Sequence, residues 1–241
     1  MHGLGTLINV AAIVAGGMAG LLCVKAITVK MRETLGSAVA LCCMFVGIAG
    51  TLEQMLHADG AALRSSGALM MVGAFALGSA LGAWLDIEGK FVRFGEWVKK
   101  KTGNASDRRF TDAFVTSSLV VCIGAMAVVG SIQDGMRGDI TILATKSVMD
   151  AIIIMVLTAS LGRGCIFSAI PVGLFQGAIT LAASLLEPLM TDAALTNIAL
   201  TGSMMIFCVG VNVIWGQKFS VANMLPTLLF APAFAFLAEL F

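Results

Sequence analysis

Long apolar stretches alternate with short polar connections along the whole chain. An α-helix needs roughly 20 apolar residues to cross the hydrocarbon core of a bilayer. Eight stretches are long enough, and the connections between them carry nearly all of the charged residues. These stretches lie at 3–24, 34–52, 65–85, 113–132, 140–162, 164–186, 193–216 and 219–238. The pattern predicts an all-α protein, a polytopic bundle of about eight transmembrane helices that forms a single integral membrane domain.

The composition agrees with a membrane protein and argues against several other classes. Hydrophobic residues make up 59% of the chain and charged residues 12%, whereas soluble domains carry about 25% charged residues. The net charge of +1 gives no electrostatic attraction for nucleic acid. The six cysteines lie in apolar stretches without metal-ligand spacing, and there are two histidines, so we expect no metal site and no cofactor.

The basic residues predict how the bundle is oriented. Lys and Arg are enriched in cytoplasmic loops. If the connection 25–33 is cytoplasmic, twelve of the 15 basic residues lie on that side, and only Arg64 and Arg137 lie outside. The twelve are Lys25, Lys30, Arg32, Lys90, Arg93, Lys99, Lys100, Lys101, Arg108, Arg109, Arg163 and Lys218. We therefore expect both termini outside the cytoplasm.

The longest connection, 86–112, is predicted to hold an amphipathic helix at the cytoplasmic interface. Its apolar residues Phe91, Phe94, Trp97 and Val98 recur at helical spacing among basic residues. Such a helix lies among the lipid headgroups, held by apolar burial and by attraction to anionic lipid. A calmodulin-like or other partner-binding role is the alternative.

Lys146 and Asp150 are charged residues inside an apolar stretch. They are four residues apart, so they share one face of the predicted helix. If Asp139 caps that helix, Asp150 lies about 15 Å along it, near the middle of a core of roughly 30 Å. Charges at this depth are costly and usually functional. The pair suggests a cation or proton site whose carboxylate is balanced by Lys146 when empty, and the alternative is a pair that only fixes helix packing.

Polar uncharged residues inside the spans form a second group of candidates. The amides are Asn9, Gln176, Asn197, Asn212 and Asn223. Intramembrane amides usually form hydrogen bonds between helices. Asn223 differs because two prolines follow it, Pro226 and Pro232, and proline cannot donate the helical hydrogen bond. A kinked or broken helix is predicted there, of the kind from which transporters build substrate sites.

Glycines spaced four residues apart predict where helices approach closely. The two pairs are Gly16 with Gly20 and Gly78 with Gly82. Small residues at this spacing let two helix backbones come into contact within a membrane.

A weak internal repeat of 80 residues aligns 37–82 with 117–162, and each copy is a two-helix unit. The copies differ at polar positions, where Gln133, Asp134, Lys146 and Asp150 of the second stand against Glu53, Gln54, Ser66 and Met70 of the first. This asymmetry places the candidate site on the fourth and fifth spans, with Asp134 at the outer mouth. A fainter match of 36–50 with 202–216 suggests an inverted repeat, which is common in secondary transporters.

The run GSIQDGMRGD from Gly130, followed by Lys146-Ser147 and Asp150, carries a resemblance together with VANMLPTLLFAP from Val221. These segments resemble a bacterial inner-membrane family, domain of unknown function 554, which includes the YqgA/YdfK-like proteins. The likeness covers nearly the whole chain. It implies an integral protein of the bacterial inner membrane and adds Ser147 to the candidates, but it brings no settled substrate.

These observations predict transport of a small solute or ion, by a secondary transporter more than by a channel. The candidate binding residues are Asp150, Lys146, Asp134, Gln133, Ser147 and Asn223, with Pro226 and Pro232 as helix breaks. The alternative is a non-transporting scaffold or sensor whose charges only lock the bundle. We expect the lipid bilayer and a solute or ion as partners, with H⁺ or Na⁺ coupling, and no nucleic acid. No catalytic constellation is recognisable, so we expect no enzyme, and a homo-oligomer is left open.

Overall fold

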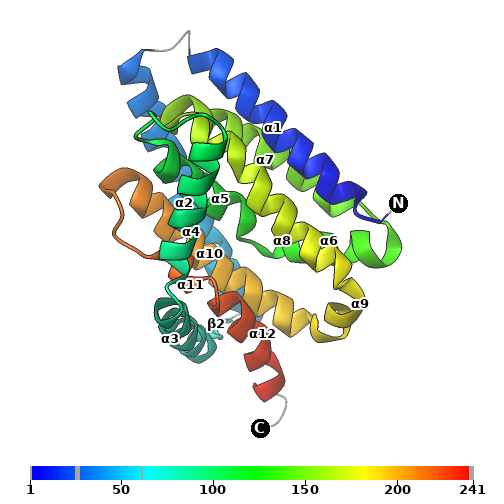
Figure 1. Ribbon diagram of the computed structural model, residues 1–241. Coiled ribbons are helices and arrows are strands. Elements are labelled where there is room, and N and C mark those ends of the chain that lie inside the picture. Colours follow the sequence, from blue (N-terminus) through cyan, green and yellow to red (C-terminus); the bar gives the residue numbers. More distant parts are fainter. Residues whose placement is uncertain (1, 25–27, 61, 239–241) are drawn as a thin grey trace.

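The computed structural model describes residues 2–24, 28–60 and 62–238. Within these ranges the chain forms a bundle of helices and one β-hairpin (Figure 1). The elements are α1 (Leu4–Val24), α2 (Val29–Met55), β1 (Leu56–Asp59), β2 (Ala62–Ser65), α3 (Ala68–Trp84), α4 (Ile87–Lys101), α5 (Phe110–Cys122), α6 (Ala125–Arg137), α7 (Thr141–Leu161), η1 (Arg163–Ser168), α8 (Ala169–Leu181), α9 (Ala183–Leu186), η2 (Glu187–Leu189), α10 (Asp192–Trp215), α11 (Val221–Met224) and α12 (Thr227–Ala238).

The helices confirm the predicted helical, polytopic membrane bundle. Among the described residues, five segments are long and apolar enough to cross a bilayer: α1, α2, α7, η1 with α8, and α10. The number rises to seven if α3 with α4 and α5 with α6, two pairs bent by 55° and 65°, each count as one span. Eight spans would also require the shorter apolar segment Val221–Phe236, so the eighth span stays a prediction.

Two helix pairs pack against each other most extensively, α1 with α7 and α2 with α10 (Figure 1). Glycines bring the backbones together in the first pair. A Cβ atom on Gly16 would clash with the carbonyl oxygen of Ala151, and one on Gly20 would clash with that of Met155. The predicted packing role of Gly16 and Gly20 is therefore confirmed. Because the contacts advance in the same direction along both helices, from Gly16 with Ala151 to Gly20 with Met155, α1 and α7 run parallel.

Glycines also bring the backbone of α3 into contact with the C-terminal segment. A Cβ on Gly78 would clash with the backbone nitrogen of Thr227, and one on Gly82 would clash with the carbonyl oxygen of Asn223. Pro226 lies between these two contacts, where α11 ends and α12 begins. The glycine face of α3 therefore packs directly on the proline break, whereas Pro232 lies inside α12 without interrupting it.

The predicted span over 113–132 is not one continuous helix. The chain there forms two helices, α5 and α6, which meet at Ile123 and Gly124 with a bend of 65°. Gly124 has φ 142° and ψ 149°, a conformation that residues with a Cβ rarely adopt. The break is made by a glycine without a proline nearby, and the sequence analysis did not predict it.

The segment 86–112 contains the predicted amphipathic helix, α4, but much of its apolar face packs on protein. The rings of Phe91 and Phe94 lie 5.7 and 5.8 Å from the ring of Phe114 on α5. Val98 is buried against the same cluster, whereas the Trp97 side chain is 54% exposed. The aromatic residues therefore hold α4 against α5, and contact with lipid stays a prediction for the exposed face that carries Trp97.

The segments matched by the 80-residue repeat fold differently. In the first segment α2 is continuous and is followed by the β1–β2 hairpin, in which Leu56 pairs with Ser65. In the second segment the helix is broken at Gly124, and a turn at Gly138 leads into α7. The duplication stays a prediction. The segments of the fainter match lie in α2 and α10, which pack antiparallel, with Gly47 against Ser203 and Phe207.

Candidate functional site

The centre of the site is an ion pair within α7. The Lys146 ammonium donates to both carboxylate oxygens of Asp150, with Nζ 2.8 Å from Oδ1 and 2.7 Å from Oδ2. Both residues are buried. Asp150 is nine residues after Thr141, the first residue of this 21-residue helix, or roughly 13.5 Å at 1.5 Å per residue. The pair therefore lies near the middle of a membrane-spanning helix.

Asp139 lies at the start of α7 but does not cap it in the predicted way. Its Oδ1 accepts from the backbone N–H of Thr141 at 2.9 Å, while Ile140 occupies the cap position. Hydrogen bonds from Thr141 keep the pKa of this exposed carboxyl below its ordinary value. Asp139 therefore orders the turn before α7, and the depth expected for Asp150 is nearly unchanged.

Two amides connect the ion pair to neighbouring helices. The Asn9 side chain on α1 donates through Nδ2 to Asp150 Oδ2 at 3.0 Å and to Gln176 Oε1 on α8 at 3.3 Å. Asn9 and Gln176 are both completely buried. Together with Lys146 they form a four-residue network across three helices, which we call the central network. The sequence identified both amides but could not select them from the other three.

The central network keeps unused hydrogen-bonding capacity. Within the described part of the chain, neither Asn9 Oδ1 nor Gln176 Nε2 has a hydrogen-bond partner, although both atoms are buried. Most buried polar side-chain atoms in proteins have a partner, either in the protein or in an ordered water. One acceptor and one donor of the central network are therefore available for a water or a solute.

The break between α5 and α6 lies at the depth of the ion pair. A Cβ on Gly130 of α6 would lie 2.9 Å from Leu143 of α7, and α6 runs antiparallel to α7. Continuing along both helices brings Lys146 and Asp150 to the level of Gly124. The Cys122 thiol, two residues before the break, lies within electrostatic range of both charges.

A helix break changes the local backbone chemistry. The last carbonyls of α5 and the first N–H groups of α6 lose their intrahelical partners at Ile123 and Gly124. Gly202 of α10 faces this point, since a Cβ there would lie 3.6 Å from the Gly124 Cα. The break therefore places backbone groups that lack intrahelical partners inside the bundle, where Gly202 packs against them.

Asp134 has a different position from the one predicted. Its Oδ1 accepts from the backbone N–H of Gly3 at 3.1 Å, and its Oδ2 accepts from that of Gly5 at 2.9 Å. The residue is completely buried. A carboxylate on the first N–H groups of a helix is stabilising. The structure places Asp134 as the cap of α1, not at an open mouth.

Gln133 and Ser147 lie apart from the hydrogen bonds of the central network. Gln133 lines a small cavity with Arg137 of α6 and Glu187 of η2, whose side chains approach to 3.8 Å. The Ser147 hydroxyl donates to the carbonyl of Leu143 one turn earlier at 2.6 Å. Neither side chain has a recorded hydrogen bond to the Lys146–Asp150 pair.

Asn223 lies at the junction of α3, α4 and α11. Its Oδ1 accepts from the backbone N–H of Glu88 at 2.9 Å, in the first turn of α4. Asn223 therefore caps a helix end beside the Pro226 break.

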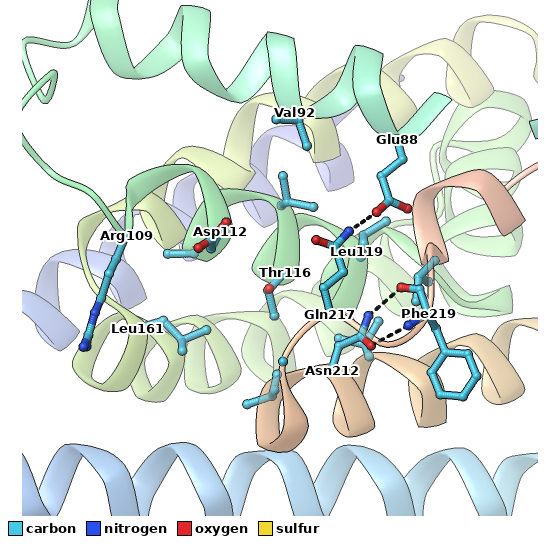
Figure 2. A pocket seen from close by; sticks show the side chains of 16 residues that line it. Glu88, Val92, Arg109, Asp112, Thr116, Leu119, Leu161, Asn212, Gln217 and Phe219 are labelled. Carbon is cyan, nitrogen blue, oxygen red and sulfur yellow. Dashed lines mark hydrogen bonds between the residues drawn. The ribbon is translucent and has the colours of Figure 1, made fainter. Parts of the chain in front are cut away.

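A polar cavity of about 370 Å³ opens at the same end, which the basic residues predict to be cytoplasmic. Figure 2 shows Asp112, Thr116 and Gln217 directed toward one space, while Arg109 extends away from Glu88. Gln217 donates to Glu88, whose other carboxylate oxygen has no partner among the described residues. Partial burial raises the pKa of Glu88 above its ordinary value.

Leu119 lines both this polar cavity and a second, apolar one of about 340 Å³. Cys122 and Phe175 line the apolar cavity, which also touches Pro226. Cys122 lies near enough to Lys146 and Asp150 to interact with them electrostatically. Side chains on one face of α5 thus extend from the polar cavity to the depth of Asp150.

A small polar cluster between α5, α7 and η1 was missed in the sequence. The Cys165 thiol lies 3.6 Å from the carbonyl oxygen of Ala113 and faces the hydroxyls of Ser117 and Thr158. All three side chains are completely buried, and the Thr158 hydroxyl has no hydrogen-bond partner among the described residues. In sequence such residues cannot be told from small packing residues, so no signal was available.

Metal ligands do not gather in the described ranges. No group of three His, Cys, Asp or Glu side chains there is close enough to hold a metal ion. The candidate site is therefore described by one ion pair, two amides and a helix break.

Comparison with known proteins gives the family. Residues 4–236 match the model of a protein family of unknown function, DUF554. The chain is 26% identical over 237 residues to the uncharacterized membrane protein YdfK of Bacillus subtilis (strain 168), covering 98% of this chain and 97% of the relative. It is 27% identical over 235 residues to the uncharacterized protein YqgA of Escherichia coli (strain K12), covering 95% and 94%. No solved structure matches significantly. The predicted resemblance is confirmed, and the chain belongs to the DUF554 family.

Proposed function

We propose that this protein carries a small solute or ion across the bacterial cytoplasmic membrane as a secondary transporter. The binding site is the central network of Asp150, Lys146, Asn9 and Gln176. The observation that supports this most is the buried ion pair at mid-helix, beside an amide acceptor and an amide donor without partners. An intramembrane charge of this kind is a functional site by default.

The geometry weighs against a purely structural role for the charges. Lys146 and Asp150 lie on one helix, so their ion pair cannot by itself hold two helices together. Among the described residues, the Asn9 amide alone links the pair to α1 and α8, and intramembrane hydrogen bonds contribute about 0.6 kcal/mol on average. A charged residue at the centre of a membrane helix costs about 2.5–3.5 kcal/mol on translocon scales. The free-energy cost of burying two charges is therefore larger than the stability that this one link between helices contributes.

The surroundings supply what a carrier needs. The break at Gly124 offers backbone groups at the depth of the site, as broken helices do in secondary transporters. The polar cavity around Asp112, Thr116 and Gln217 offers water-accessible space at one end of the bundle. With both termini outside the cytoplasm, as the basic residues predict, this cavity is the cytoplasmic entrance.

Uptake into proteoliposomes tests the proposal. A screen of ions, amino acids and organic acids at two pH values should find a solute that wild-type protein accumulates. Asp150→Asn keeps the size of the side chain and one acceptor oxygen but removes its charge, so the variant should fold and lose at least tenfold of the uptake. Asp139→Asn, on the exposed outer turn, is the matched control and should keep wild-type uptake.

Other outcomes would assign the protein to another class. A channel would show no acceleration of uptake when the solute is placed on the opposite side, whereas a carrier would. If no solute moves and Asp150→Asn changes only thermal stability, the transport proposal fails and the protein is a membrane scaffold or sensor.

A further inference from the structure

We infer that an anionic phospholipid binds beside α4, with an acyl chain in the apolar cavity and its phosphate next to Lys90. This inference goes beyond the proposed function and does not depend on transport. The observations behind it are the place and lining of that cavity and the basic residues on the exposed surface of α4.

The wall of the apolar cavity suits a hydrocarbon chain. Phe91 of α4, Phe175 of α8 and Leu228 of α12 all line it. The hydroxyl of Ser118, which also lines it, donates to the carbonyl of Phe114 at 2.6 Å. The volume of about 340 Å³ is within the range of ligand pockets, roughly 300–1,000 Å³. A polar solute loses hydrogen bonds with water on entering such a space, whereas an acyl chain has none to lose.

The cavity extends from one end of the bundle toward its middle. At the first end, Ile87 lines it and is followed by Glu88, which accepts from Gln217 just beyond the end of α10. At the other end, Cys122 lines it and lies within electrostatic range of Asp150, near the middle of α7. A chain along this wall therefore follows one leaflet, about half of a hydrocarbon core of roughly 30 Å.

The cavity lies at the surface of the bundle that contacts the bilayer. Leu229 of α12 lines it and is nevertheless 74% exposed. It belongs to the apolar segment Val221–Phe236, in which an exposed leucine side chain is as apolar as the lipid tails around it. A lipid chain can therefore enter the cavity sideways from the membrane.

The exposed surface of α4 is basic. Its exposed charged residues include Lys90, Arg93, Lys100 and Lys101. Arg93 pairs with Asp86 at 3.2 Å, whereas no ion pair is recorded for the three lysines within the described ranges. Basic residues at a membrane surface attract anionic lipid. The charge next to the apolar cavity therefore favours an anionic headgroup over a zwitterionic one.

Lys90 is the residue placed to meet the phosphate. It follows Ile87 by three residues, so the two side chains are neighbours on the surface of α4. A lysine side chain can lie along apolar surface while its ammonium reaches the headgroups. Trp97, seven residues further along the same face, is 54% exposed, and tryptophan is enriched at the membrane interface. The flank of Lys90 and Trp97 therefore suits the headgroup level, with the apolar cavity beside it.

The experiment compares two lipids with identical acyl chains, phosphatidylglycerol and phosphatidylcholine. Both are added to the full-length protein in detergent, and binding is followed by native mass spectrometry and by the melting temperature. Phosphatidylglycerol should remain bound and raise the melting temperature more than phosphatidylcholine, since a ligand stabilises the state it binds. Glycerol phosphate, which has the phosphate without an acyl chain, should have no effect.

A first variant tests the headgroup contact. Lys90→Gln should weaken the binding of phosphatidylglycerol about fivefold and leave that of phosphatidylcholine unchanged. Lys218→Gln removes another exposed basic residue, after the end of α10 and outside the lining of the apolar cavity, and should bind both lipids as wild type does.

A second variant tests the acyl-chain contact. Leu229→Trp places a larger side chain in the mouth of the cavity and should weaken the binding of both lipids about tenfold. The matched control is Leu181→Trp at the end of α8, where the leucine is 89% exposed and does not line the cavity. This control should bind as wild type does.

Several results would overturn the inference. Equal binding of the two lipids by wild-type protein would remove the anionic preference, and an unchanged preference in Lys90→Gln would remove the headgroup contact. Wild-type affinity in Leu229→Trp, or stabilisation by glycerol phosphate alone, would exclude the acyl chain from the cavity. If Leu229→Trp does not fold, Lys90→Gln on its exposed flank still decides. None of these measurements uses solute uptake, so the inference and the transport proposal fail separately.

Discussion

The side-chain amide of Asn9 lies 3.0 Å from the carboxylate of Asp150, across 141 positions of the sequence. This contact joins the first helix of the bundle to the helix that carries both buried charges. It also brings in Gln176, so one amide group of α1 ties together α7 and α8. Asn9 is therefore the residue that links the ion pair to both neighbouring helices.

Replacing Asn9 by Leu should separate packing from function. The change leaves Gln176 Oε1 without its donor, and an unsatisfied buried acceptor costs about 1–3 kcal/mol. We expect a lower melting temperature together with loss of solute uptake.

Asn197 provides the control for that substitution. Its Nδ2 donates to the carbonyl of Ala231 at 3.0 Å, between α10 and α12, away from the charged pair. Asn197→Leu should lower the melting temperature to a similar degree and keep uptake. Equal loss of uptake in the two variants would mean that stability alone explains the Asn9 effect.

The ion pair predicts non-additive stability effects. Lys146→Met leaves the Asp150 carboxylate buried without its counter-ion, and Asp150→Leu leaves the ammonium in the same position. Each single change should cost about 3–5 kcal/mol, whereas the double change should be nearly neutral. Thermal unfolding of the four proteins in detergent measures the coupling. Simple addition of the two losses would contradict the bidentate geometry.

Asp134 should behave as a helix cap. Asp134→Ala removes the acceptors of Gly3 and Gly5 and should lower stability by about 0.5–2 kcal/mol. Asp134→Asn keeps one side-chain oxygen and should lose less. Both variants should transport solute at the wild-type rate once folded. A folded Asp134→Asn protein without uptake would show that Asp134 takes part in transport and is more than a helix cap.

We predict that Gly82, where α3 contacts the proline break, cannot be replaced by a residue with a side chain without loss of stability. A Cβ on Gly82 would clash with the carbonyl oxygen of Asn223, which is rigid backbone. Gly82→Ala should therefore cost about 1–3 kcal/mol as the two segments separate. Gly177, on α8, has nothing within 4 Å of the corresponding position, and Gly177→Ala should be tolerated. Comparable melting temperatures for the two variants would argue against the close approach.

The features that the sequence predicted well depend on composition and short-range spacing. Long apolar runs predict membrane helices directly, and the i, i+4 spacing of Lys146 and Asp150 makes their contact nearly unavoidable. The packing role of Gly16 and Gly20 follows from the same local reasoning. Each of these depends on residues within one or two helical turns.

The features that were missed depend on long-range contacts. Asp134 has the same local signature as a solute ligand, and only the position of α1 shows that it is a cap. Asn9 and Gln176 belong to one network because α1, α7 and α8 meet, which no pattern near either residue reveals. The break at Gly124 was missed because one glycine in an apolar run is equally typical of straight, closely packed helices.

The parallel pairing of α1 with α7 has a consequence for biogenesis. Helices enter the membrane in the order of synthesis, so α1 is inserted before its partner α7. The residue that caps α1, Asp134, and the first residue of α7, Thr141, are both synthesised later. When α7 enters the translocon, its two charges can neutralise each other within one helix, before any neighbour is engaged. The helix that holds the buried ion pair thus carries its own counter-ion into the bilayer, and Asn9 on the earlier helix α1 is its partner there.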